Sequence, residues 1–208
     1  MTIENAIASK LLEVGAVKLN SEIPFTWTSG LKSPIYCDNR RLLSFPMQRD
    51  FVKSELCRVI FEEFPDADVL AGVATAGIPW GAMAADQLKM PFIYVRPTPK
   101  SHGLGNQIEG YLEEGKKVLV IEDLISTGKS SLEVCKVINE AKCEVSGMVS
   151  IFNYNFESTI ESFNKAGINL RSLSNYQNLI EVALTKNLIK VENIDSLLKW
   201  RMDPVSWA

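Results

Sequence analysis

The stretch KVLVIEDLISTGKSS, residues 117–131, predicts a buried strand, a turn of small residues and the start of a helix. Its apolar residues form one continuous run, as in a strand that is covered on both faces of a sheet. Glu122 and Asp123 end that run, and Ser126, Thr127 and Gly128 lead into the helical pattern. Such a stretch forms an anion-binding cradle, because the first N–H groups of a helix have no partner within it.

The turn at residues 126–130 supplies the donors that a phosphate monoester needs. Gly128 lets the backbone approach the anion, and the hydroxyl groups of Ser126, Thr127 and Ser130 can donate hydrogen bonds. The two carboxylates before the turn would repel phosphate, so they must serve another group. Adjacent hydroxyls of a ribose suit paired acceptors, and ribose 5-phosphate therefore satisfies both halves of the stretch.

Two better-known phosphate loops do not match the sequence. A Walker A loop requires glycine five residues before Gly128, where Asp123 stands. A Rossmann fingerprint through Gly103 and Gly105 requires glycine where Ile108 stands. The cradle therefore belongs to neither class.

The chain around this stretch alternates apolar runs with helical patterns. The expected strands cover residues 69–75, 92–96, 117–123 and 145–152. This alternation predicts an α/β fold with a doubly wound, mainly parallel sheet. Ligands bind such sheets beyond the carboxyl ends of the strands, so the site is expected after Val73, Val95 and Ile121.

Smaller elements are expected around this core. The length favours one domain over residues 1–208, with an N-terminal hood over about residues 1–45 and a core over about residues 46–208. Pro24, Gly30 and Pro34 interrupt the hood, as expected of short strands joined by turns. Helices are expected over residues 3–17, 46–64, 78–89, 156–166 and 176–200, with Gly15 marking the end of the first, and an edge strand is expected near 168–173.

Composition and charge disfavour several classes of protein. The net charge is −3 and the basic residues are scattered, so we expect neither nucleic acid nor a membrane surface as a partner. No apolar run approaches the ~20 residues of a membrane span, and the start does not resemble a signal peptide. The four cysteines show no CxxC spacing and His102 is the only histidine, which disfavours a zinc site. A cytoplasmic protein with reduced thiols is expected.

The segment VLVIEDLISTGKSS resembles the phosphoribosyl pyrophosphate motif of the type I phosphoribosyltransferases. That motif is an apolar strand, two acids, two apolar residues and a loop rich in threonine and glycine. The resemblance implies that Glu122 and Asp123 hold the ribose hydroxyls, with Asp123 also catalytic, and that residues 126–130 hold the 5-phosphate. The residues assigned to phosphoribosyl pyrophosphate in this motif are Glu122, Asp123, Leu124, Ile125, Ser126, Thr127, Gly128, Lys129 and Ser130.

The polar segment RPTPKSHGLGNQIEG, residues 96–110, is expected to be a lid, since it follows a strand and has almost no apolar content. Arg96, Lys100 and His102 suit an oxygen-rich polyanion such as pyrophosphate. The segment resembles the catalytic loop of orotate phosphoribosyltransferases, which implies that Lys100 and His102 are catalytic. It also implies a homodimer whose active sites are shared between subunits. Pro97 and Ala76 stand where some members carry lysine.

The stretch FTWTSGLKSPIYCDNR, residues 25–40, resembles the hood of the same family through its S-G-x-K-S-P core. A planar anionic base needs an apolar slot with a few donors. The residues expected to bind orotate are Ile35, Tyr36 and Arg40 of the hood, together with Ser126 of the turn after the acid pair. Two further positions depart from the family: Thr28 replaces a lysine of some members, and Tyr154 or Asn155 lies near the position where some members have an orotate-binding arginine.

The expected reaction displaces pyrophosphate from a sugar that becomes oxocarbenium-like. Mg²⁺ is the expected cofactor, held mainly by substrate oxygens because few protein ligands are available. Two alternatives remain open. One is transfer to another base such as adenine, and the other is a non-catalytic regulator that senses phosphoribosyl pyrophosphate and binds nucleic acid. A regulator is expected to carry a DNA-binding extension or a basic face.

Overall fold

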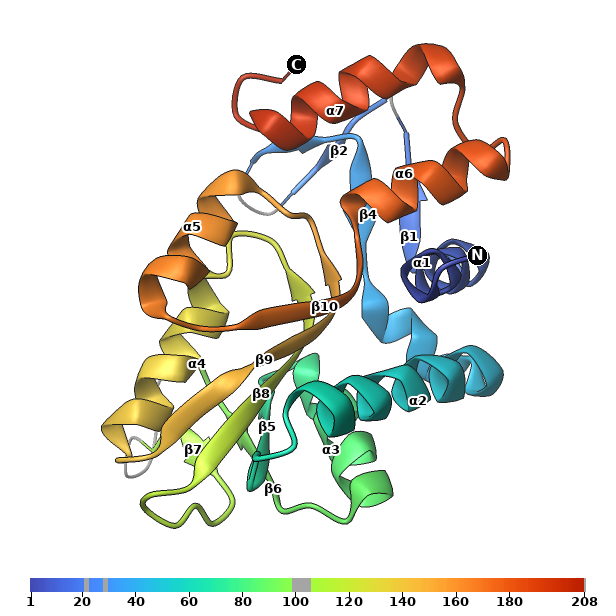
Figure 1. Ribbon diagram of the computed structural model, residues 1–208. Helices are drawn as coiled ribbons and strands as arrows, with labels where there is room; N and C mark the ends of the chain where they lie inside the picture. The colour runs from blue at the N-terminus through green and yellow to red at the C-terminus, as the bar shows by residue number, and fades with distance from the viewer. Residues whose placement is uncertain (21–22, 28–29, 99–105, 208) are drawn as a thin grey trace.

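A six-stranded sheet forms the centre of the computed structural model, which describes residues 1–20, 23–27, 30–98 and 106–207 (Figure 1). The strand order is β10-β9-β8-β5-β6-β7, and every neighbouring pair is parallel except the last, β6 with β7. The predicted α/β fold with a doubly wound, mainly parallel sheet is thereby confirmed. The strands are β5 (Val69–Val73), β6 (Phe92–Val95), β7 (Ile108–Glu109), β8 (Lys117–Ile125), β9 (Glu144–Asn153) and β10 (Leu170–Asn175).

The alternation of side chains along β8 divides the interior into two cores. Leu119 and Ile121 pack on the side of α1 (Ile3–Glu13), α2 (Pro46–Glu63) and α3 (Gly77–Leu88). Val118 and Val120 pack on the opposite side, with α4 (Lys129–Glu140) and α5 (Glu157–Ala166). Figure 1 shows these two groups of helices on opposite faces of the sheet. Because both faces are covered, β8 is apolar without a break until Glu122.

The hood consists of short strands that pair away from the main sheet. β1 (Val17–Leu19) pairs with β4 (Ile35–Cys37), and β2 (Phe25–Thr26) pairs with β3 (Lys32–Ser33), both antiparallel. A 3-10 helix, η1 (Asn39–Ser44), then leads from the hood to α2. The short strands predicted within residues 18–38 are therefore confirmed.

The C-terminal part of the chain completes the hood, which the sequence did not indicate. It contains α6 (Tyr176–Thr185), the 3-10 helix η2 (Val191–Asn193) and α7 (Ile194–Met202). The indole N–H of Trp200 donates to the carbonyl of Lys32 over 3.1 Å, and Trp200 meets Trp27 edge-on at 5.8 Å between ring centroids. Figure 1 shows α7 beside β2 at the top of the view. The hood is thus built from both ends of the chain.

Several predicted boundaries were wrong, for local reasons. The stretch 176–200 is not one helix, since α6 ends before Asn187, which has a left-handed backbone with φ of 56°. The end of the first helix, by contrast, was predicted correctly, since Gly15 follows the C-cap Val14 with a left-handed backbone of φ 66°. The strand predicted to end at Asp123 continues to Ile125, because β9 pairs with it as far as that residue. The segment predicted as a lid also contains β7.

The cysteines and helices agree with two further expectations. Cys57, Cys135 and Cys143 are buried, Cys37 is half-buried, and all are free thiols. In the described part of the chain, no helix is both long enough and apolar enough to cross a membrane.

Candidate active site

The acid pair lies within β8 and is held from two sides. Glu122 accepts a 2.8 Å hydrogen bond from the hydroxyl of Ser131 in α4, and its other carboxylate oxygen accepts the N–H of Asp123 over 3.1 Å. On the hood side, the side-chain amide of Asn39 donates to the carbonyl of Asp123 over 2.7 Å. These contacts place the acid pair between α4 and the hood.

Both carboxyl groups are held in surroundings that disfavour their charge. Burial raises the pKa of Glu122 well above its ordinary value, the negative charge of Asp123 raises it further, and the hydrogen bond from Ser131 opposes both. Burial also raises the pKa of Asp123, while hydrogen bonds and the positive charge of Arg40 oppose that rise. Two adjacent buried acids at the end of a strand are costly to keep ionised, which is typical of a functional site.

Glu122→Gln is expected to make the protein more stable near neutral pH. Because the folded-state pKa of Glu122 lies above its ordinary value of 4.5, the folded chain binds more protons than the unfolded chain between those two pKa values. Stability is then lost as pH rises through this window. We expect the melting temperature of the wild type to fall relative to that of Glu122→Gln as the pH rises from the ordinary pKa of 4.5 toward the raised pKa of the folded state.

The matched control is Glu133→Gln, which removes a partly exposed glutamate from α4, the helix that carries Ser131. Its melting temperature should follow the wild type at every pH. Parallel curves for the wild type and Glu122→Gln would contradict the raised pKa.

The turn after the acid pair is arranged as a cradle. Gly128 has a left-handed backbone with φ of 70°, and a side chain there would collide with the ring of Phe163. Gly128 is also the N-cap of α4, which has no side-chain cap among the described residues, so its first N–H groups remain available to an anion. Thr159 in α5 donates a 2.6 Å hydrogen bond to the carbonyl of Ser126 and fixes the entry to the turn.

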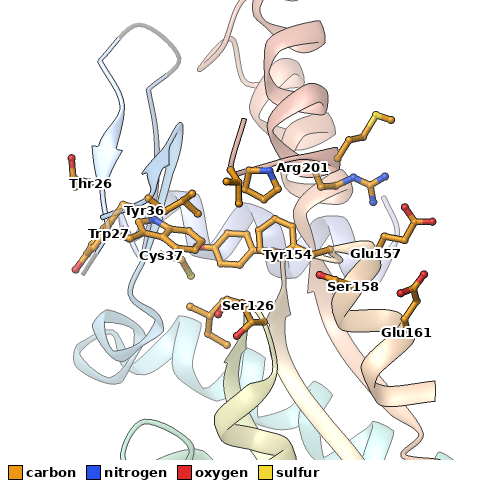
Figure 2. Close-up of a pocket in the computed structure, with 17 residues that line it drawn as sticks. Thr26, Trp27, Tyr36, Cys37, Ser126, Tyr154, Glu157, Ser158, Glu161 and Arg201 are labelled. Atoms are coloured by element: carbon orange, nitrogen blue, oxygen red, sulfur yellow. The ribbon is translucent and has the colours of Figure 1, made fainter. Parts of the chain in front are cut away.

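A cavity of about 820 Å³ opens beside this turn. Figure 2 shows that the hood residues Trp27 and Tyr36, Ser126 of the turn and Tyr154 at the end of β9 contribute to its wall. Aromatic side chains with a few polar groups are typical of a pocket for a flat ring. The residues that line it are Thr26, Trp27, Leu31, Tyr36, Cys37, Leu124, Ser126, Thr127, Tyr154, Phe156, Glu157, Ser158, Glu161, Arg201, Met202, Pro204 and Val205.

Four of the predicted binding residues line this cavity, and two others are instead buried in the core. Leu124, Ser126, Thr127 and Tyr36 line it. Ile35, expected to bind orotate, is fully buried in the core, whereas Tyr36 and Cys37 of the same strand line the cavity. Its N–H donates to the hydroxyl of Ser33. Ile125, assigned to phosphoribosyl pyrophosphate, is also fully buried, because its side chain packs in the core beneath α4 and α5.

Other predicted residues lie near the site but outside the cavity wall. Arg40, expected to bind orotate, pairs with Asp38 through contacts of 2.6 and 3.0 Å and does not line the cavity. Its charge instead influences Asp123. Lys129 lines a separate hollow of about 440 Å³ between α4 and α5, and Ser130 is exposed in the first turn of α4.

The lid residues are only partly described. Arg96 directly follows β6, and its Nε lies 3.4 Å from a carboxylate oxygen of Glu109 in β7. Since β6 is parallel to β5, Arg96 lies at the same edge of the sheet as the end of β5. Lys100 and His102 lie outside the described residues, as does Thr28.

The sequence reasoning missed the contribution of the C-terminal segment. Arg201, Met202, Pro204 and Val205 line the cavity, although they lie far along the chain from the hood and the turn. Tyr154 and Phe156 also line it, and their rings stack at 5.5 Å between centroids. The aromatic-rich ending WRMDPVSWA was the one sequence signal for this wall, and no spacing rule placed it there.

Comparisons with known proteins give consistent results. A model of the phosphoribosyl transferase domain matches residues 54–165. A protein of Phocaeicola vulgatus named orotate phosphoribosyltransferase is 52% identical over 206 residues, covering 99% of this chain and 97% of that protein. The crystal structure of orotate phosphoribosyltransferase from Aeropyrum pernix superposes with a TM-score of 0.72 at 28% identity, covering 87% of this chain and 99% of that one. The structure of Leishmania donovani UMP synthase gives 0.77 at 26% identity, covering 95% of this chain and 42% of that one.

Proposed function

The chain belongs to the orotate phosphoribosyltransferase family, and from this premise we propose how its residues carry out the reaction. The enzyme transfers the ribose 5-phosphate group of phosphoribosyl pyrophosphate to orotate, giving orotidine 5'-monophosphate and pyrophosphate, a step of pyrimidine biosynthesis. The bond between the anomeric carbon and pyrophosphate breaks, a bond from that carbon to a ring nitrogen of orotate forms, and the proton on that nitrogen is released. One observation carries the assignment of the site: the aromatic cavity opens directly beside the glycine turn that follows the acid pair.

The turn and the acid pair are proposed to hold phosphoribosyl pyrophosphate. The 5-phosphate binds the N–H groups of residues 126–130 and the hydroxyls of Ser126, Thr127 and Ser130. Glu122 and Asp123 accept hydrogen bonds from the ribose hydroxyls. The side chains of Ile125, which is buried, and Leu124, which lines the cavity, are left out of this role, although their backbone shapes the turn.

The base is proposed to lie in the cavity against Tyr36 and Tyr154, with Ser126 at its edge. In that position the ring nitrogen faces the anomeric carbon of a sugar held by the acid pair. Arg96, Lys100 and His102 are proposed to neutralise the pyrophosphate as it leaves. Arg96 must then exchange its contact with Glu109 for the substrate.

Mg²⁺, a homodimer and a cytoplasmic location complete the proposal. Few oxygen donors of the protein are available at the acid pair, so Mg²⁺ would be held mainly by oxygens of the substrate, where it would neutralise charge on the pyrophosphate. A dimer with shared sites is supported by the family resemblance of residues 96–110. Four free thiols are typical of a reducing compartment.

A panel of bases tests the function. With phosphoribosyl pyrophosphate and Mg²⁺ present, orotate should give a nucleotide product and adenine should give none, as followed by release of pyrophosphate. EDTA should abolish the reaction and added Mg²⁺ should restore it. Product from adenine and none from orotate would overturn the base assignment while leaving the phosphoribosyl site intact.

A further inference from the structure

The cavity wall carries a single positive charge among its described residues. Arg201 is the only lysine, arginine or histidine among them. Orotate bears a carboxylate that is ionised at neutral pH, and a buried carboxylate requires a charged or well-aligned donor. We infer that Arg201, from the C-terminal helix α7, binds the carboxylate of the orotate ring. This inference rests on the proposed function of the same site.

Arg201 is held in place by its neighbours on both sides of the cavity. The preceding residue, Trp200, is fully buried and contacts the rings of Trp27, Tyr154 and Phe156 at 5.3 to 5.8 Å between centroids. The guanidinium group of Arg201 donates to the carbonyl of Asn155 over 3.4 Å, just beyond the end of β9. Figure 2 shows Arg201 coming from α7 toward the part of the cavity near Glu157.

The guanidinium group retains donors for a ligand. It has five N–H groups in one plane, of which the contact with Asn155 uses one. Within the described part of the chain, Arg201 forms no ion pair with a carboxylate. A planar fork that is half-buried and not already paired is suited to a carboxylate on a flat ring.

Two glutamates also line the cavity and weaken its positive field. Glu157 and Glu161 lie on α5, and both are exposed to solvent, whereas Arg201 is half-buried. Water and salt screen exposed charges more strongly than buried ones. Glu157 also lies in the first turn of α5, where the helix dipole favours a negative charge. Among the charged side chains of the cavity wall, Arg201 is therefore the one least screened by solvent.

Two nucleotides that differ only in the carboxylate test the inference. Orotidine 5'-monophosphate carries it, and uridine 5'-monophosphate does not. We expect Arg201→Gln to weaken binding of the first nucleotide by about 10- to 100-fold in a calorimetric titration and to leave binding of the second unchanged. In steady-state kinetics, the KM for orotate should rise while the KM for phosphoribosyl pyrophosphate stays constant. Arg201→Lys should bind orotidine 5'-monophosphate with an affinity between those of the wild type and Arg201→Gln, since it keeps the charge and loses the planar fork.

Glu157→Gln is the matched control, because it changes a charge in the same wall without removing a donor to the carboxylate. This variant should not weaken the binding of either nucleotide. If Arg201→Gln weakened the binding of both nucleotides equally, or of neither, the proposed role of Arg201 would be overturned. A wild-type enzyme that forms no product from orotate would instead overturn the proposed function, so the two failures are distinguishable.

Discussion

Asp123→Asn is expected to lower the turnover number by about 10²–10³-fold while leaving the fold intact. The anomeric carbon gains positive charge as pyrophosphate leaves, and a carboxylate held close to the sugar stabilises that charge. Burial raises the pKa of Cys37 and of Tyr154, which both line the cavity, and the charge of Asp123 adds to each rise, so this charge reaches the reaction space. Asparagine keeps the shape of the side chain and the backbone contact with Asn39, but not the charge.

Steady-state kinetics and thermal unfolding together check this prediction. Burial raises the pKa of Asp123, so its neutral replacement should unfold at the same temperature as the wild type or higher. Asp86→Asn, an exposed position on α3, is the matched control and should retain full activity. A turnover number for Asp123→Asn within a few-fold of the wild type would show that Asp123 is not a catalytic residue.

Lys100→Ala is expected to cause a loss of similar size, about 10²–10³-fold in turnover, with no change in melting temperature. Lys100 lies outside the described residues, so this expectation rests on the sequence of the lid and its family resemblance. The lysine is assigned to the leaving pyrophosphate, and its removal should leave developing charge without a donor. An unchanged turnover number would contradict the assignment of the loop.

Mixing the two variants tests whether the lid acts on the partner subunit. If it does, a dimer of one Lys100→Ala and one Asp123→Asn subunit contains one intact site and one site with both changes. An equal mixture, after subunit exchange, should recover roughly one quarter of wild-type activity, because half of the dimers are mixed. No recovery is expected if each lid serves its own subunit. A mixture of Lys100→Ala with Lys100→Ala is the baseline.

Much of the core could be predicted because its signals are local. The apolar run of β8, the acid pair and the glycine turn are contiguous, and each depends on hydrogen bonds or periodicity within a few residues. The positions of Tyr36 and Ile35 relative to the cavity were harder to predict from the sequence. Both belong to the short strand β4, and only the packing of the hood decides that Tyr36 reaches the cavity and Ile35 the core. For Arg40, the nearby Asp38 offered a partner that the motif did not reveal.

The sequence by itself determined the fold class, the phosphate turn and the family of the chain, since these depend on local patterns and on motifs that remain readable without coordinates. The tertiary structure alone decided that the C-terminal helix α7 closes the hood and brings Arg201 to the cavity. The contact between Trp200 and Lys32 joins positions 168 residues apart. Burial of aromatic surface is non-directional, so no pattern within either segment specifies its partner, and only the packed chain shows which distant segments meet.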